Sequence, residues 1–192
     1  MRTRILIIAL ATASTSLAAQ DTTPDSLPFR RGQWAVQFVG SLGASVGLLK
    51  FRSASSAWVV DVGVSGQHEE DIADTSVAVY SQAIVSVLLG QRKYRPLANK
   101  VAAYRSLGLL MSYTHNLSGS PFGRSTSNGW QLGPFANVGG TYLVTSHLGI
   151  GATGQVRIAY GRSTFRSSIT PKTRSWSLSG TTSIGLQGAI FF

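Results

Sequence analysis

The feature of this sequence that most constrains the fold is an alternation of side-chain character with a period of two residues. In the segment 58–64, Trp and Val occupy the even positions, while the odd positions include Asp61 and Gly63. The segments 148–160 and 174–192 alternate in the same way, with mainly apolar even positions and small or polar odd positions. Such alternation is typical of β-strands, because successive side chains of a strand point to opposite faces. A helix with this pattern would have no apolar stripe.

Counting the alternating runs predicts eight strands, which cover residues 33–42, 44–53, 57–67, 77–90, 101–115, 129–143, 148–163 and 174–192. The connections at 53–56 and 144–147 are tight, whereas those at 68–76, 117–128 and 163–173 are long and polar. Long and short connections largely alternate, as in barrels with short turns on one side of a membrane and longer loops on the other.

Two connections depart from this alternation. The stretch 91–100 is long for a periplasmic turn, and the stretch 40–43 is short for an external loop. Pro134 lies inside the sixth run and has no amide hydrogen to donate to a neighbouring strand. It therefore indicates either a β-bulge or a lipid-facing break in the hydrogen-bond ladder.

The composition of the two strand faces distinguishes a soluble sandwich from a membrane barrel. In a soluble sandwich, the face opposite the apolar one meets water and carries charged side chains. Here that face consists of Gly, Ser, Thr, Ala and Gln, which suit a narrow barrel interior while the apolar face meets lipid. Past residue 19, no apolar stretch is long enough for a membrane-spanning helix. Aromatic residues near the predicted strand ends fit the two interfacial girdles of such a barrel: Trp34, Trp58, Trp130, Tyr142, Tyr160 and Trp176.

These observations predict an all-β fold, an eight-stranded antiparallel up-and-down transmembrane β-barrel over residues 33–192. The first nineteen residues have the pattern of a secretory signal peptide: Arg2 and Arg4, an apolar run, and the small residues of 14–19. The alternative is an uncleaved anchor helix, but the apolar run is about half of the roughly twenty residues that such a helix needs. Residues 20–32 are polar and contain two prolines, so we expect a flexible periplasmic segment there.

The C-terminal run 184–192 and the signal peptide together resemble the small outer-membrane β-barrel family, the eight-stranded barrels of the OmpA and OmpX kind. The resemblance implies that the last strand is the signal for the barrel assembly machinery, with Phe192 as its terminal aromatic residue. The glycine that the family places five residues before the end is Gln187 here. The family also implies the outer membrane of a Gram-negative-type bacterium as the location, and we expect a monomer with no periplasmic domain after the barrel. The residues assigned to the assembly signal are Ile184, Leu186, Ile190 and Phe192.

Few residues suggest chemistry, and we expect no catalytic residue, metal or cofactor. There is no Cys, and motifs for phosphate or dinucleotide binding are missing. The acidic cluster His68-Glu69-Glu70-Asp71 allows two interpretations, a site for a hard cation or a solvated loop tip. Lipid A deacylases are barrels of this size that use a Ser and a His, and His115 with Ser118 is the nearest feature. No oriented acid accompanies that pair, and the order of residues in that family is absent.

The chain carries a formal net charge of +10, or +8 once Arg2 and Arg4 leave with the signal peptide. Secretion and membrane-facing strands exclude nucleic acid as a partner. The residues Arg92, Lys93, Arg95 and Lys100 fall in one expected periplasmic connection, and Arg162, Arg166, Lys172 and Arg174 surround an external one. The partners expected are outer-membrane lipid and the anionic sugar-phosphate of lipopolysaccharide. Solvated connections without a fixed ligand are the alternative.

Two charges fall on the inward face in strand interiors, Asp61 and Arg157. An isolated charge in a narrow barrel is costly, so we expect these two side chains to interact directly or through neighbours. An eight-stranded barrel is filled by side chains, which predicts an occluded lumen. The function expected is a non-enzymatic surface role, structural, adhesive or protective. The alternatives are a narrow pore for small solutes and a lipid A-modifying enzyme.

Overall fold

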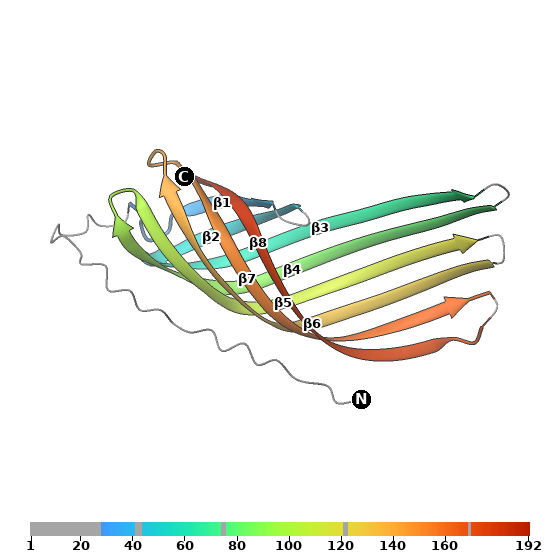
Figure 1. Ribbon diagram of the computed structural model, residues 1–192. Coiled ribbons are helices and arrows are strands. Elements are labelled where there is room, and N and C mark those ends of the chain that lie inside the picture. Colours follow the sequence, from blue (N-terminus) through green and yellow to red (C-terminus); the bar gives the residue numbers. More distant parts are fainter. Residues whose placement is uncertain (1–27, 41–43, 74–75, 121–122, 169) are drawn as a thin grey trace, which may run out of the picture.

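The computed structural model describes residues 28–40, 44–73, 76–120, 123–168 and 170–192. They form eight antiparallel strands in one closed barrel, in which each strand pairs with its sequence neighbours and β8 returns to β1 (Figure 1). The predicted fold is thus confirmed. The expected signal peptide and residues 20–27 lie outside the described residues. The strands are β1 (Trp34–Gly40), β2 (Ala44–Ser53), β3 (Ser56–Ala73), β4 (Ser76–Ala98), β5 (Val101–Ser120), β6 (Gly123–Leu143), β7 (Leu148–Ser167) and β8 (Thr173–Phe191).

The alternation in the sequence corresponds to the two faces of the barrel wall. In β7, Gly149 and Ala159 face the interior and are buried, whereas Ile150 and Ile158 face outward and are exposed. A soluble protein would bury those isoleucines, so their exposure follows from lipid being the solvent for this face. Among the described residues, no helix is long and apolar enough to cross a membrane.

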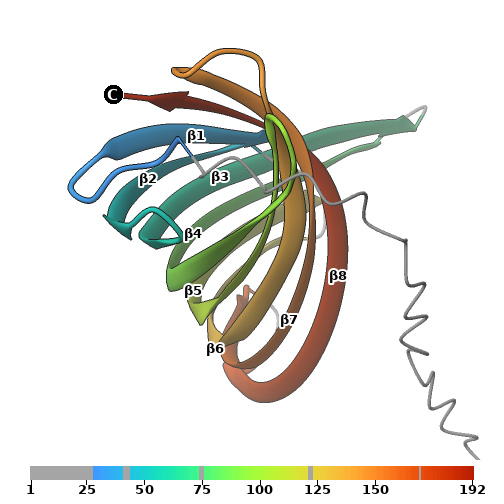
Figure 2. The same cartoon turned by 90° about the vertical axis from the view of Figure 1, so that its left-hand side faces the viewer.

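The start of β1, the end of β8 and the tight turns lie together at one end of the barrel (Figures 1 and 2). We refer to it as the periplasmic end, because short turns face the periplasm in barrels of this type. Exposed outward-facing Trp and Tyr residues lie in two groups. The periplasmic aromatic belt comprises Trp34, Trp58 and Tyr142, and the outer aromatic belt comprises Tyr113, Trp130, Tyr160 and Trp176.

The strands are staggered around the barrel. Hydrogen-bonded partners followed from Ala35 through β2 to β7 lead to Thr181 on β8. Ala35 itself pairs with Phe191, which lies ten residues further along β8. The strands are therefore strongly tilted, and an eight-stranded barrel with tilted strands has a bore that side chains fill.

The strands β3 to β7 are longer than the sequence pattern predicted, and this corrects four of the connections. The stretch 91–100 is not a long turn, because β4 continues to Ala98 and only Asn99 and Lys100 form the turn. On the opposite side, most of the polar stretches 68–76, 117–128 and 163–173 belong to strands. Their alternation was hidden because both faces are polar there, outside the lipid band. β3 to β8 thus continue as a polar sheet beyond the outer aromatic belt (Figure 1).

The ladder between β6 and β7 is interrupted at Pro134. Leu132 pairs with Tyr160 and Phe135 pairs with Arg157, whereas Gly133 and Pro134 have no partner on β7. Pro134 is exposed on the outer face. The predicted lipid-facing break at this proline is confirmed.

Candidate functional site

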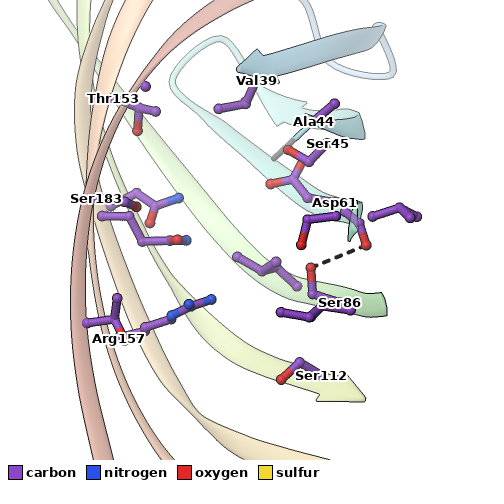
Figure 3. A pocket seen from close by; sticks show the side chains of 18 of the residues that line it. Val39, Ala44, Ser45, Asp61, Ser86, Ser112, Thr153, Arg157 and Ser183 are labelled. Carbon is purple, nitrogen blue, oxygen red and sulfur yellow. Dashed lines mark hydrogen bonds between the residues drawn. The ribbon is translucent and has the colours of Figure 1, made fainter. Parts of the chain in front are cut away.

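The interior of the barrel holds a cavity of about 550 Å³. Asp61 and Ser86 lie on one wall, and Arg157, Thr153 and Ser183 lie on the opposite wall (Figure 3). The rest of the lining is mainly hydroxyl and amide side chains from the inward positions of the strands, so the cavity is polar.

A chain of hydrogen bonds forms the floor of this cavity. The Gln37 amide Nε2 donates to Asp61 Oδ1, and Gln37 Oε1 accepts from Arg92 Nη1 at 2.8 Å. Arg92 Nε donates to Ser106 Oγ at 3.0 Å, and the guanidinium lies 4.1 Å from the ring centroid of Tyr104. Because Arg92 and Asp61 are only 3% and 5% exposed, each charge depends on this network for compensation.

Gly47 permits this arrangement. A Cβ atom at position 47 would lie 1.7 Å from Asp61 Oδ1 and 2.8 Å from Gln37 Cγ. Only glycine leaves space there for the carboxylate and the amide that bonds to it.

Aromatic rings close the periplasmic end below this floor. Phe29 is 3% exposed, and its ring centroid lies 4.6 Å from that of Phe51, 4.8 Å from that of Tyr94 and 5.2 Å from that of Phe191. Gly32 N donates to the Phe51 carbonyl oxygen at 2.8 Å, which fixes the chain that carries Phe29. Residues 28–32, from the segment expected to be flexible, thus contribute a plug, and the lumen is closed toward the periplasm.

The two interior charges that the sequence singled out line the same cavity but are not in contact. No hydrogen bond or ion pair joins Asp61 to Arg157 within the described residues, so their coupling stays a prediction. Asp61 instead bonds to Gln37, which connects it to Arg92. Sequence reasoning missed Arg92 because it ended the fourth strand at residue 90. Continuing the strand would have placed Arg92 on the same face as Leu88, inside the barrel.

The candidate Ser–His pair is separated by the pleat of β5. His115 faces outward and its Nδ1 lies 2.6 Å from Asn128 Oδ1. Ser118 is three residues away along the same strand, so its side chain points to the other face. The two side chains are therefore not placed as nucleophile and base.

The acidic cluster is also divided between two faces. His68 Nε2 and Glu70 Oε1 lie 3.4 Å apart on the outer face, and His68 Nδ1 lies 2.7 Å from Ser81 Oγ. Glu69 and Asp71 alternate to the opposite face, where Gln67 donates to Glu69. In the described ranges, no group of three His, Asp or Glu side chains is arranged to hold a metal ion.

Four arginines lie on the outer wall at or beyond the outer aromatic belt: Arg124, Arg162, Arg166 and Arg174, here called the arginine row. They occupy the even positions of β6, β7 and β8, which are the lipid-facing positions lower in the same strands. The Arg162 guanidinium lies 4.7 Å from the ring centroid of Trp176, which stacks on Tyr160. A groove of about 280 Å³ beside Arg162 is lined by Tyr113, Asn128, Gly129, Trp130 and Thr164.

The residues assigned to the assembly signal share the lipid-facing side of β8, where Ile184, Leu186, Ile190 and Phe192 are all exposed. Phe192 N donates to the Trp34 carbonyl oxygen at 3.0 Å, and Trp34 N donates to the Phe192 carbonyl oxygen at 3.1 Å. Phe192 therefore helps to join the last strand to β1, where the barrel closes. Its role in assembly stays a prediction.

Several solved outer-membrane proteins have the same fold. OprG from Pseudomonas aeruginosa superposes with a TM-score of 0.58 at 10% identity, covering 86% of this chain and 99% of that one. A major outer membrane protein from Thermus thermophilus gives a TM-score of 0.52 at 12% identity, covering 83% and 98%. Ail from Yersinia pestis, in complex with the heparin analogue sucrose octasulfate, gives 0.50 at 13% identity, covering 83% and 94%. No family model matches the sequence, and no curated protein matches it significantly.

The likeness to these solved structures and the apolar outer wall both indicate a barrel that spans a membrane. The chain has the fold of these small eight-stranded outer-membrane barrels, and the expected location in the outer membrane is confirmed.

Proposed function

We propose that this barrel is a non-enzymatic surface protein that binds the anionic sugar-phosphate of lipopolysaccharide through the arginine row. Its role in the cell envelope is then structural, adhesive or protective. The observation that carries the proposal is the position of the row. Arg124, Arg162, Arg166 and Arg174 face outward on adjacent strands, at or above the level where the lipid-facing band ends.

The chemistry of this level of the membrane supports the proposal. Phosphate groups of the outer leaflet lie just above its acyl chains, and arginine binds phosphate oxygens through charge-assisted, often bidentate hydrogen bonds. Arg162 is held over Trp176, so less side-chain freedom is lost when it binds an anion. The Ail structure contains a sulfated sugar, a polyanion of the kind that the arginine row would favour.

The two alternative functions have less support. A pore needs an open path, but the Asp61–Gln37–Arg92 chain and the plug around Phe29 close the periplasmic end. A lipid A-modifying enzyme needs a nucleophile beside a base, but β5 directs His115 and Ser118 to opposite faces.

The test compares two variants from which the same charge is removed. In the first, the four arginines of the row are replaced by Gln. In the second, Lys50, Arg52, Lys93 and Arg95, which are exposed near the periplasmic belt, are replaced by Gln. Lipopolysaccharide binding is measured for barrels in nanodiscs at several salt concentrations. We expect the first variant to lose at least tenfold in affinity and most of the salt dependence, and the second to bind normally. Equal affinities for the two variants would contradict the proposal.

A further inference from the structure

The wall of the barrel is not equally high on all sides. β1 and β2 have 7 and 10 residues, whereas the other six strands have 18 to 23. The ladder between β1 and β8 ends at the pair Gly40–Leu186, and the ladder between β2 and β3 ends at Ala44–Val64. Three residues join Gly40 to Ala44.

Beyond these pairs, two strand segments have a free edge. The backbone of Ser65–Ala73 in β3 and that of Thr173–Gly185 in β8 pair on one side only. Figure 1 shows the six long strands continuing past the ends of β1 and β2. The described wall therefore has a side opening above the β1–β2 hairpin, bordered by β3 and β8.

On its β8 side, the opening lies within the lipid-facing band. Leu178 and Ile184 are 77% and 84% exposed on the lipid-facing side of β8, and both lie further out along β8 than Leu186, the last partner of β1. Trp176 of the outer aromatic belt is further out still. Along β8, Trp176 lies ten residues beyond Leu186. The opening thus connects the lumen to the outer leaflet of the membrane.

A free strand edge in lipid is costly, because its N–H and C=O groups have no hydrogen-bond partners there. Groups with polar atoms must therefore occupy the opening. The inward side chains beside it, Ser65 on β3 and Ser179, Thr181 and Ser183 on β8, all carry hydroxyls and line the cavity. The opening is therefore a polar passage that borders directly on acyl chains.

The cavity behind the opening holds an uncompensated cation. The Arg157 side chain forms no hydrogen bond or ion pair with any residue that the structure describes, and it points into the cavity (Figure 3). Its neighbour across the ladder is Thr181, which borders the opening. Thr153 Oγ1, on the same wall, is buried and has no hydrogen-bond partner in the described part of the chain. A guanidinium without a counter-charge suits a carboxylate or phosphate, and the hydroxyl of the neighbouring Thr181 is a further donor on the same wall.

We propose that the lumen binds the anionic head of a single-chain amphiphile of the fatty-acid class. The head lies against Arg157, and the acyl chain leaves through the side opening between β3 and β8 into the outer leaflet. The cavity of about 550 Å³ accommodates such a head, and its polar lining excludes the acyl chain, which has a lipid environment immediately outside.

The first test compares oleate with oleyl alcohol, which has the same chain and no charge, in binding to the refolded barrel in nanodiscs. Arg157→Gln is expected to weaken oleate binding at least tenfold and to leave the weak binding of the alcohol unchanged. Arg105→Gln is the matched control, because Arg105 is exposed on the outer face of β5. The gel mobility shift on heating confirms that each variant is folded. Equal oleate affinity in the Arg157→Gln variant and the wild type would overturn the proposal.

The second test locates the acyl chain. Oleate with a photoreactive group at its end is expected to label β8 near Leu178 and Ile184, and excess unlabelled oleate or the Arg157→Gln change should abolish this labelling. Labelling spread evenly around the lipid-facing wall and insensitive to both would overturn the side passage. A lysophospholipid in place of oleate distinguishes a phosphate head from a carboxylate. The arginine row is unchanged throughout, so these results are independent of lipopolysaccharide binding.

Discussion

Arg92 Nη1 lies 2.8 Å from Gln37 Oε1 and so joins β4 to β1, two strands that are not neighbours in the barrel. The same Gln37 side chain donates to Asp61 on β3. The Gln37 amide thus bridges the two buried charges, Asp61 and Arg92. The bond to Arg92 crosses the bore of the barrel, because β1 and β4 are not paired in the wall. Both the stability of the barrel and the closure of its lumen depend on this contact.

A double-mutant cycle tests which cation compensates Asp61. Asp61→Ala is expected to lower the free energy of unfolding by about 3 kcal/mol, because it leaves Arg92 buried without its counter-charge. Asp61→Ala combined with Arg92→Met should recover part of that loss. The cycle with Arg157→Met, measured in the same lipid by denaturant titration, is the comparison. If the coupling energy with Arg157 equals or exceeds that with Arg92, the hydrogen-bonded floor is not what stabilises the carboxylate.

Gly47→Ala is expected to destabilise the barrel by about 2 kcal/mol, since the new methyl group overlaps Asp61 Oδ1 and the floor must rearrange. In the Asp61→Ala background, the same change should cost much less. Gly188→Ala is the control, because a Cβ there has no atom within 4 Å. Similar losses from Gly47→Ala in both backgrounds would show that the carboxylate is not the obstacle.

The closed periplasmic end predicts no measurable single-channel conductance for the wild-type barrel in planar bilayers. Phe29→Ala removes the aromatic plug alone and should leave the hydrogen-bonded floor with Arg92 in place, so the conductance should stay low. Phe29→Ala with Arg92→Ala should produce small, steady openings. Conductance steps in the wild type, at the same size as in the double variant, would refute the closure.

Cysteine labelling tests the orientation. Cysteines at Asp71, Ser120 and Ser168 lie at or beside the outer ends of the long strands, so a membrane-impermeant reagent should label them on intact cells. A cysteine at Ser146, in the turn between β6 and β7, should react only after lysis. Labelling of position 146 on intact cells would reverse the assignment of the two ends.

Deleting Phe192, or changing it to Ser, is expected to lower the amount of folded protein in the membrane while secretion continues. The residue forms two backbone hydrogen bonds with Trp34, and its exposed ring lies on the lipid-facing side of the last strand. Heat-modifiable gel mobility of membrane fractions gives the folded amount. Wild-type levels of folded protein would exclude the assembly role.

The period of two was sufficient to predict the number of strands, their faces and the inward positions of Asp61 and Arg157. It gave no boundaries where both faces are polar, so β3 to β7 are longer than predicted. Phe29 was missed because a single aromatic in a polar, proline-containing segment has no periodic signal. The side opening was also hidden, since it depends on pairing across strands: Gly40 meets Leu186, and no local pattern specifies that register.

The ladder that closes the barrel is the shortest one in it. β1 and β8 share six residue pairs, from Ala35–Phe191 to Gly40–Leu186, whereas β5 and β6 share twenty. Those six pairs join segments about 150 residues apart, so the largest loss of chain entropy is offset by the fewest hydrogen bonds. Neighbouring hairpins can zip locally, but the ring cannot close until both chain ends are present. We therefore expect closure to be the slow, late event in folding, and the same seam to be where the barrel separates first under force or denaturant.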